Sequence, residues 1–120
     1  MKRVAPQLSD HALGRALSQV VAGENAATSA VLDHIAEYDQ RKLYRPAGYA
    51  SMFAYCVDRL HLSEFGAYKR IRAARAAVRF PAIFDLVSDG RLHLSAVVLL
   101  GPYLTDSTAG IESIANTMSV

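Results

Sequence analysis

Residues 59–80 read RLHLSEFGAYKRIRAARAAVRF, and this stretch decides the fold. It opens with a Leu-x-Leu-Ser step, in which two leucines can fill the angle between two helices and a serine hydroxyl can cap the second helix. Helical spacing of apolar residues continues from Ser63 to about Arg79, and Pro81 ends the helix because the residue before a proline avoids helical geometry. The sequence therefore predicts a helix-turn-helix-like unit over residues 51–79.

The pentapeptide RLHLS occurs twice, at residues 59–63 and again at residues 91–95. The repeat predicts that Ser63 and Ser95 each begin a helix, because serine is a favoured N-cap residue. A cluster of cations follows the first copy and does not follow the second. The two copies thus predict the same turn with different surfaces.

The remainder of the 120 residues predicts one all-α domain, since 52% of the residues are hydrophobic and β-branched or aromatic residues form no alternating runs. A long helix, or two nearly collinear helices, is expected from about residue 9 to 42, with Ser9 or Asp10 as the cap and Gly23 as the weak point. Ser51 is expected to cap a short helix that ends near residue 60. The C-terminal helices are expected within residues 82–118. The first runs from about 82 to 88 and stops at Asp89-Gly90, and the last runs from Thr105 or Asp106 to about 118.

The excess of positive over negative charge is confined to one short segment, although the net charge of the chain is only +2. Residues 1–58 hold six Lys/Arg and six Asp/Glu, residues 59–79 hold six and one, and residues 80–120 hold one and four. The sequence contains no signal-peptide pattern and no apolar run of membrane-spanning length. With a single cysteine, Cys56, these features predict a cytoplasmic protein that contacts no membrane.

The predicted helix after Ser63 separates its apolar and cationic residues onto two faces. Ala67, Ile71, Ala74 and Val78 form a stripe about 60° wide that must pack on the core. The cations project from the other faces and predict contacts with DNA phosphates, with one or two reading base edges. The predicted DNA-binding residues are Lys69, Arg70, Arg72, Arg75 and Arg79. The competing interpretation is a solvated basic face that binds nothing.

Candidate sites of other kinds are weak. The four histidines have no metal-ligand spacing, no nucleophile and base accompany the carboxylates of the long helix, and no phosphate-binding loop is present. The sequence therefore predicts no metal, no cofactor, no small-molecule substrate and no enzymatic activity.

Several segments together resemble the N-terminal helical region of bacterial HNH endonuclease-like proteins. The resemblance spans roughly residues 8–105 and is carried by LSD at 8–10, AEYDQRKLY at 36–44, GYASMFAYC at 48–56, LHLSE at 60–64, AYKRIRAAR at 67–75, RFP at 79–81 and DGRLHLS at 89–95. It implies a DNA-associated helical domain. Separately, residues 60–71 resemble the centre of a bacterial helix-turn-helix, in which glycine is usual where His61 stands. The HNH motif that would supply catalysis is absent from this chain.

Two further interpretations compete with a non-catalytic module that binds double-stranded DNA. The long N-terminal helix spans about 50 Å at 1.5 Å per residue and exposes apolar positions that a domain of this size does not cover. This favours a homodimerisation or protein-interaction domain, which is compatible with DNA binding because helix-turn-helix proteins commonly bind as dimers. The last interpretation, the remnant of a nuclease, would require activity with Mg²⁺ or Mn²⁺.

Overall fold

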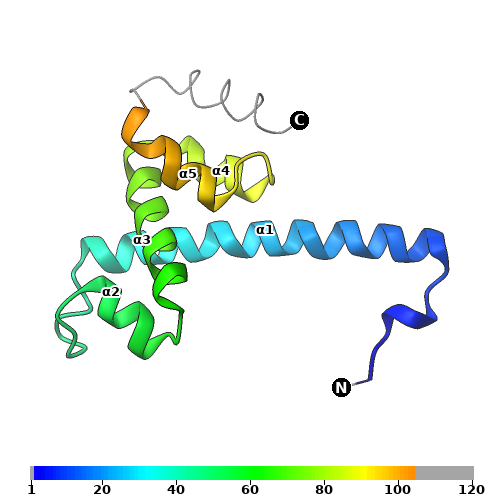
Figure 1. Ribbon diagram of the computed structural model, residues 1–120, viewed down its shortest axis with the longest axis horizontal. Coiled ribbons are helices and arrows are strands. Elements are labelled where there is room, and N and C mark those ends of the chain that lie inside the picture. Colours follow the sequence, from blue (N-terminus) through cyan, green and yellow to red (C-terminus); the bar gives the residue numbers. More distant parts are fainter. Residues whose placement is uncertain (1, 105–120) are drawn as a thin grey trace.

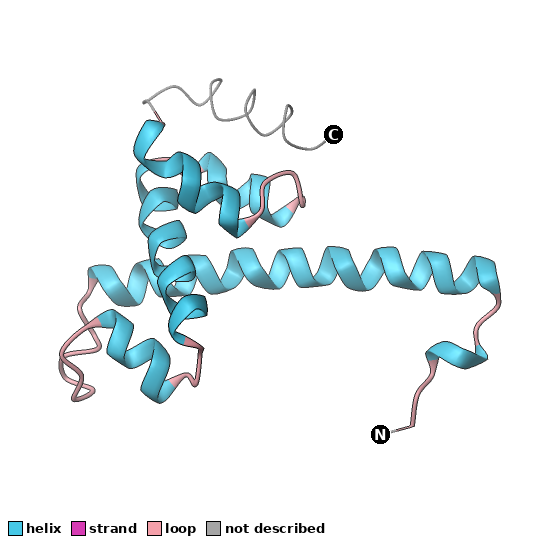
Figure 2. Ribbon diagram, viewed as in Figure 1, coloured by secondary structure: helices cyan, strands magenta, loops and turns pink. Residues whose placement is uncertain are grey.

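The computed structural model describes residues 2–104, and this part of the chain is helical with no β-strand (Figures 1 and 2). The predicted all-α fold is therefore confirmed. The elements are η1 (Ala5–Gln7), α1 (Asp10–Gln40), α2 (Met52–Ala54), η2 (Tyr55–Arg59), α3 (Glu64–Arg79), α4 (Ala82–Ser88), α5 (Leu94–Leu100) and η3 (Gly101–Tyr103). The helix predicted near the C-terminus, from residue 105 or 106 to 118, lies outside the described residues.

Helix α1 is one continuous helix of 31 residues, capped by Ser9, whose hydroxyl accepts a hydrogen bond from the Ala12 amide at 3.2 Å. Gly23 does not interrupt it. Its buried residues, Leu32, Ile35 and Ala36, all lie in the C-terminal third. Residues 25–29 lie against α4, and the N-terminal half of the helix projects from the molecule, which measures 50 × 40 × 19 Å along its principal axes (Figure 1).

Helix α3 crosses the C-terminal third of α1 and forms the centre of the core, with α4 packed on α1 and α5 packed on α3 (Figure 1). Its buried residues are Ala67, Ile71, Ala73, Ala74 and Ala77. The predicted core stripe was therefore too narrow, and its last member was wrong, because Val78 is 39% exposed. Since α3 packs against both α1 and α5, its buried surface extends to alanines that a single packing partner would leave in solvent.

The turn before α3 follows the first RLHLS copy. Ser51 and Ser63 cap α2 and α3, accepting hydrogen bonds from the Ala54 amide at 3.0 Å and the Gly66 amide at 2.9 Å. The α2 helix continues into the wider π-helical turn of η2, and the chain then reverses at His61, whose φ of 59° lies in the left-handed region. A non-glycine residue rarely adopts this conformation, so the turn places His61 where glycine would be less strained.

The second RLHLS copy folds differently, and the prediction that Ser95 caps a helix was wrong. Helix α5 begins at Leu94, two residues earlier than a cap at Ser95 would place it, and its N-cap is His93, which makes no side-chain capping bond. The backbone of His93 is not left-handed, with φ at −91°. The predicted end of α4 is correct, because Asp89 is its C-cap and Gly90 follows with φ at 75°.

Candidate nucleic-acid interface

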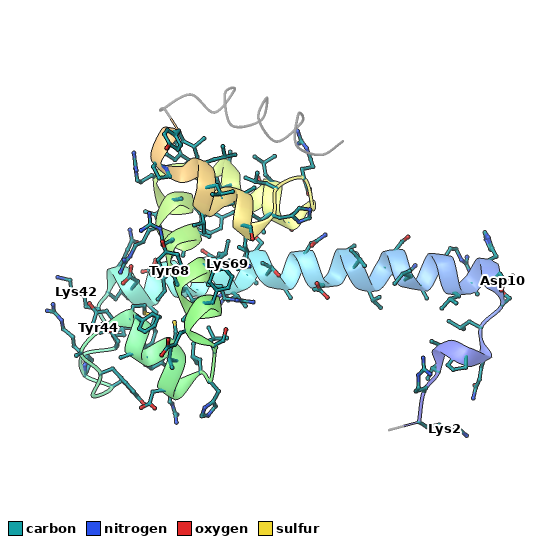
Figure 3. The ribbon with its side chains drawn as sticks, in the orientation of Figure 1. Lys2, Asp10, Lys42, Tyr44, Tyr68 and Lys69 are labelled. Carbon is teal, nitrogen blue, oxygen red and sulfur yellow. The ribbon has the colours of Figure 1, made fainter. Side chains whose placement is uncertain are left out.

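The cations of α3 lie on the face that the core leaves open. Arg72, Arg75 and Arg79 are exposed, whereas Lys69 and Arg70 are half-buried. Tyr68 and Lys69 mark this face in Figure 3, at the opposite end of the molecule from Lys2 and Asp10. The segregation of cations from the apolar flank thus places several guanidinium groups together on one helix.

Two of these arginines, Arg72 and Arg79, have no carboxylate partner within residues 2–104. Their guanidinium carbons lie 5.4 Å from the centre of the Tyr68 ring and 5.1 Å from that of the Phe80 ring. Such contacts hold a guanidinium over an aromatic face without neutralising its charge. Both groups therefore remain available to an anion.

Arg75 is engaged within the molecule by Asp39 of α1. Its Nε donates to Asp39 Oδ2 at 3.0 Å and its Nη2 to Asp39 Oδ1 at 3.2 Å, which is a bidentate ion pair. The Asp39 side chain is 14% exposed and that of Arg75 is 62% exposed. Hydrogen bonding to Asp39 raises the pKa of Arg75 above its ordinary value. The sequence did not indicate Asp39 as the partner of Arg75, because the two residues lie 36 positions apart. The ion pair connects α3 to α1.

Arg70 and Lys69 also have contacts within the chain. Arg70 Nη1 donates to the Gly66 carbonyl oxygen at 3.1 Å, along its own helix. Lys69 Nζ lies 3.4 Å from Ser95 Oγ and 5.0 Å from the centre of the Phe65 ring. Both side chains could turn toward a ligand only by giving up these contacts. Among the five predicted residues, the structure leaves Arg72 and Arg79 the most available.

A hollow of about 320 Å³ lies between α3 and the α5–η3 segment. Arginine side chains form one wall of the hollow and apolar or small residues form the other, so a positively charged surface faces an apolar one. It is far too small for a duplex, but it suits a single phosphate and sugar from the edge of one. The lining residues are Arg72, Arg75, Ala76, Arg79, Val97, Val98, Gly101 and Pro102.

Two aromatic residues of α3 add to this face and were not predicted as part of the site. Phe65 is 67% exposed and Tyr68 is 46% exposed, although large aromatic side chains usually find a packing partner. Their positions one turn before Lys69 and Arg72 could have been read from the sequence as i,i+4 pairs. The interface therefore alternates aromatic and cationic groups along α3.

The remaining tyrosines near the turn serve the fold. The Tyr38 and Tyr55 rings are stacked with centroids 4.6 Å apart, and the Tyr49 ring meets Tyr55 edge-on at 5.3 Å. This cluster fastens the 41–50 loop to α1 and η2.

Residues 2–104 contain no group of three histidine, cysteine or acidic side chains arranged to hold a metal ion. In the same part of the chain, no helix combines the length and apolar character needed to cross a membrane. Comparison of the chain with protein-family models, with curated proteins and with solved structures finds no match.

Proposed function

We propose that the protein is a non-catalytic DNA-binding module whose α3 helix contacts the phosphate backbone of a duplex. The observation that carries the proposal is the placement of Arg72 and Arg79 on one exposed wall, without a carboxylate partner in residues 2–104. Guanidinium groups bind phosphates bidentately, and a rigid helix presents them at fixed spacing. In this arrangement Ser63 caps the helix that carries the contacts.

The roles of the five predicted residues differ in this proposal. Arg72 and Arg79 bind phosphates directly, while Arg75 chiefly holds α3 on α1 through Asp39. Lys69 and Arg70 contribute positive potential from half-buried positions. The exposed ring of Phe65, at the first turn of α3, can meet a thymine methyl group or a sugar. Affinity would thus come from few contacts, and its salt dependence would be shallow.

The proposed role agrees with the resemblance to the N-terminal region of HNH endonuclease-like proteins, in which a separate module would cut DNA. The left-handed residue at position 61 supports the separate resemblance of residues 60–71 to a helix-turn-helix, because the turn requires the conformation that glycine adopts most easily. A helix-turn-helix reading of residues 51–79 and a cytoplasmic location both belong to the proposal. DNA cleavage is no part of it.

Fluorescence anisotropy with a labelled duplex at low salt tests the proposal. We expect the double variant Arg72→Ala/Arg79→Ala to lose most of the affinity for DNA, because two phosphate contacts disappear. The matched control is Arg3→Ala/Arg15→Ala, which removes the same charge from exposed positions near Lys2 and Asp10, far from α3. Equal affinities of the two variants would show that the α3 arginines are a solvated face.

A further inference from the structure

We infer that the projecting half of α1 pairs with the same segment of a second copy, in antiparallel orientation. This inference does not depend on DNA binding by α3. Asn25 and Ser29 are half-buried beside α4, and Ser29 Oγ donates to the Phe84 carbonyl oxygen at 2.7 Å, whereas residues 10–24 of α1 bury no side chain and run largely through solvent. A single helix of that length is marginally stable in water, and Gly14 and Gly23 weaken it further. A partner is therefore needed to hold the observed helix.

The projecting half carries a continuous apolar stripe. Leu13, Leu17, Val20 and Val21 are 42%, 59%, 65% and 48% exposed, and they fall within an arc of about 100° on the helix. Positions 13, 17, 20, 24, 27 and 31 follow alternating steps of four and three, which is the a/d spacing of a helix pair. The stripe joins the face that is buried in the C-terminal third, so a second helix would extend the core outward.

The charges of this segment suit a second copy. Residues 10–28 contain only Asp10, Arg15 and Glu24 as formally charged side chains, with a sum of −1, so two copies hardly repel each other. Glu24 lies in the middle of the stripe and decides the orientation. In a parallel pair, Glu24 would face the partner's Glu24, and like charges that face each other between paired helices are unfavourable.

The antiparallel register that pairs Leu17 with the partner's Val20 removes this conflict. It sets Glu24 opposite the partner's Leu13, close to the N-terminus of the partner helix, where the helix dipole favours a carboxylate. The contact then covers residues 10–27, about 27 Å of helix. Two helices in contact over that length bury roughly 1,000 Å² in total, near the lower limit of specific interfaces. We therefore expect a dimer that forms in the micromolar range.

A shallow hollow of about 550 Å³ supports this placement. It lies between α1 and the end of α4 and is lined by Leu17, Val21 and Ala22 on the α1 side and by Ser88 and Asp89 on the other. A helix lying along the stripe would pass the mouth of this hollow, so its side chains could meet the end of α4 as well as α1. The second copy would thus touch two elements of the first.

Light scattering between about 1 and 100 µM tests the dimer, because the chain mass is 13.0 kDa. We expect the mass to double with concentration for the parent and to stay near 13.0 kDa for Leu17→Glu/Val20→Glu. These side chains are exposed, so the variant keeps the core, which thermal unfolding of the globular part verifies. The matched control, Gln19→Glu/Ala26→Glu, adds the same charge on the opposite side of α1 and should dimerise.

A parent mass of 13.0 kDa at every concentration would overturn the dimer, and a dimeric Leu17→Glu/Val20→Glu variant would overturn the face. Spin labels at Ser18→Cys and, separately, at His11→Cys test the orientation, since Cys56 is fully buried and stays unlabelled. The antiparallel pair places the Ser18 labels closer together than the His11 labels by roughly 10 Å or more. Equal distances would mean a parallel pair and contradict the register. The Arg72→Ala/Arg79→Ala variant should still dimerise, which separates this inference from the proposed function.

Discussion

Replacing Asp39 with asparagine should increase DNA affinity while it weakens the fold. The substitution removes the carboxylate that holds Arg75 at 3.0 and 3.2 Å, so the guanidinium, whose side chain is 62% exposed, can turn to a phosphate. One added phosphate contact steepens the slope of log K against log salt by about 0.9, equivalent to roughly eightfold tighter binding at 0.1 M salt. Anisotropy titrations over a range of salt concentrations measure both quantities.

The same substitution should cost about 1 kcal/mol of stability. An exposed ion pair contributes roughly 0.2–1 kcal/mol, and the upper part of this range applies because solvent screens Arg75 but hardly reaches Asp39. The midpoint of thermal unfolding should then fall by about 5 °C. Asp33→Asn is the control, since it removes an exposed carboxylate from the same helix without breaking an ion pair.

An unchanged salt slope in folded Asp39→Asn would refute the reasoning, because it would mean that a free guanidinium at position 75 meets no phosphate. An equal gain of DNA affinity in Asp33→Asn would show that the gain comes from the change in net charge and not from release of Arg75. When Asp39 is present, Arg75→Ala should change DNA affinity little, because the Arg75 guanidinium is already paired with the Asp39 carboxylate.

Three further predictions concern the fold. Ser63→Ala should destabilise the protein by about 1 kcal/mol in urea unfolding through loss of the α3 cap, whereas Ser95→Ala should change stability by less than about 0.5 kcal/mol because Ser95 caps no helix; equal losses would contradict the different roles of the two repeats. His61→Gly should stabilise the protein by roughly 0.5–1 kcal/mol in the same assay, since relief of the left-handed strain exceeds the added entropy of the unfolded chain, and a loss of stability would contradict the strained turn. Burial raises the pKa of the Cys56 thiol above its ordinary 9.0, so the folded state keeps the proton to a higher pH than the unfolded state does. The resulting stability is present below pH 9.0 and is lost as the pH rises through the folded pKa. The midpoint of thermal unfolding should therefore fall more steeply above about pH 9 in the parent than in Cys56→Ala.

The features that the sequence predicted correctly are those that short-range chemistry decides. Ser9, Ser51 and Ser63 cap helices because a hydroxyl three residues before a free amide can accept its hydrogen bond wherever the chain lies. Gly90 follows the end of α4 because glycine adopts the left-handed conformation at little cost. The separation of cations from the apolar flank of α3 likewise follows from helical periodicity alone.

The features that the sequence missed depend on tertiary contacts. Ala73 and Ala77 are buried because α3 has packing partners on two sides, and one helix pattern cannot show how many partners it will meet. The Asp39–Arg75 pair joins α1 and α3, and the sequence of neither helix predicts where the two helices cross. The second RLHLS copy begins its helix two residues earlier than the first copy does, so identical local sequence did not impose identical local structure.

The proposed role of Arg72 and Arg79 is to neutralise DNA phosphates. Its most direct test is the salt slope of duplex binding, measured for the parent, for each single alanine variant and for the double variant. We expect each substitution to lower the slope by about 0.9 and the double variant to lower it by about twice as much. Slopes identical to that of the parent in all three variants would contradict it.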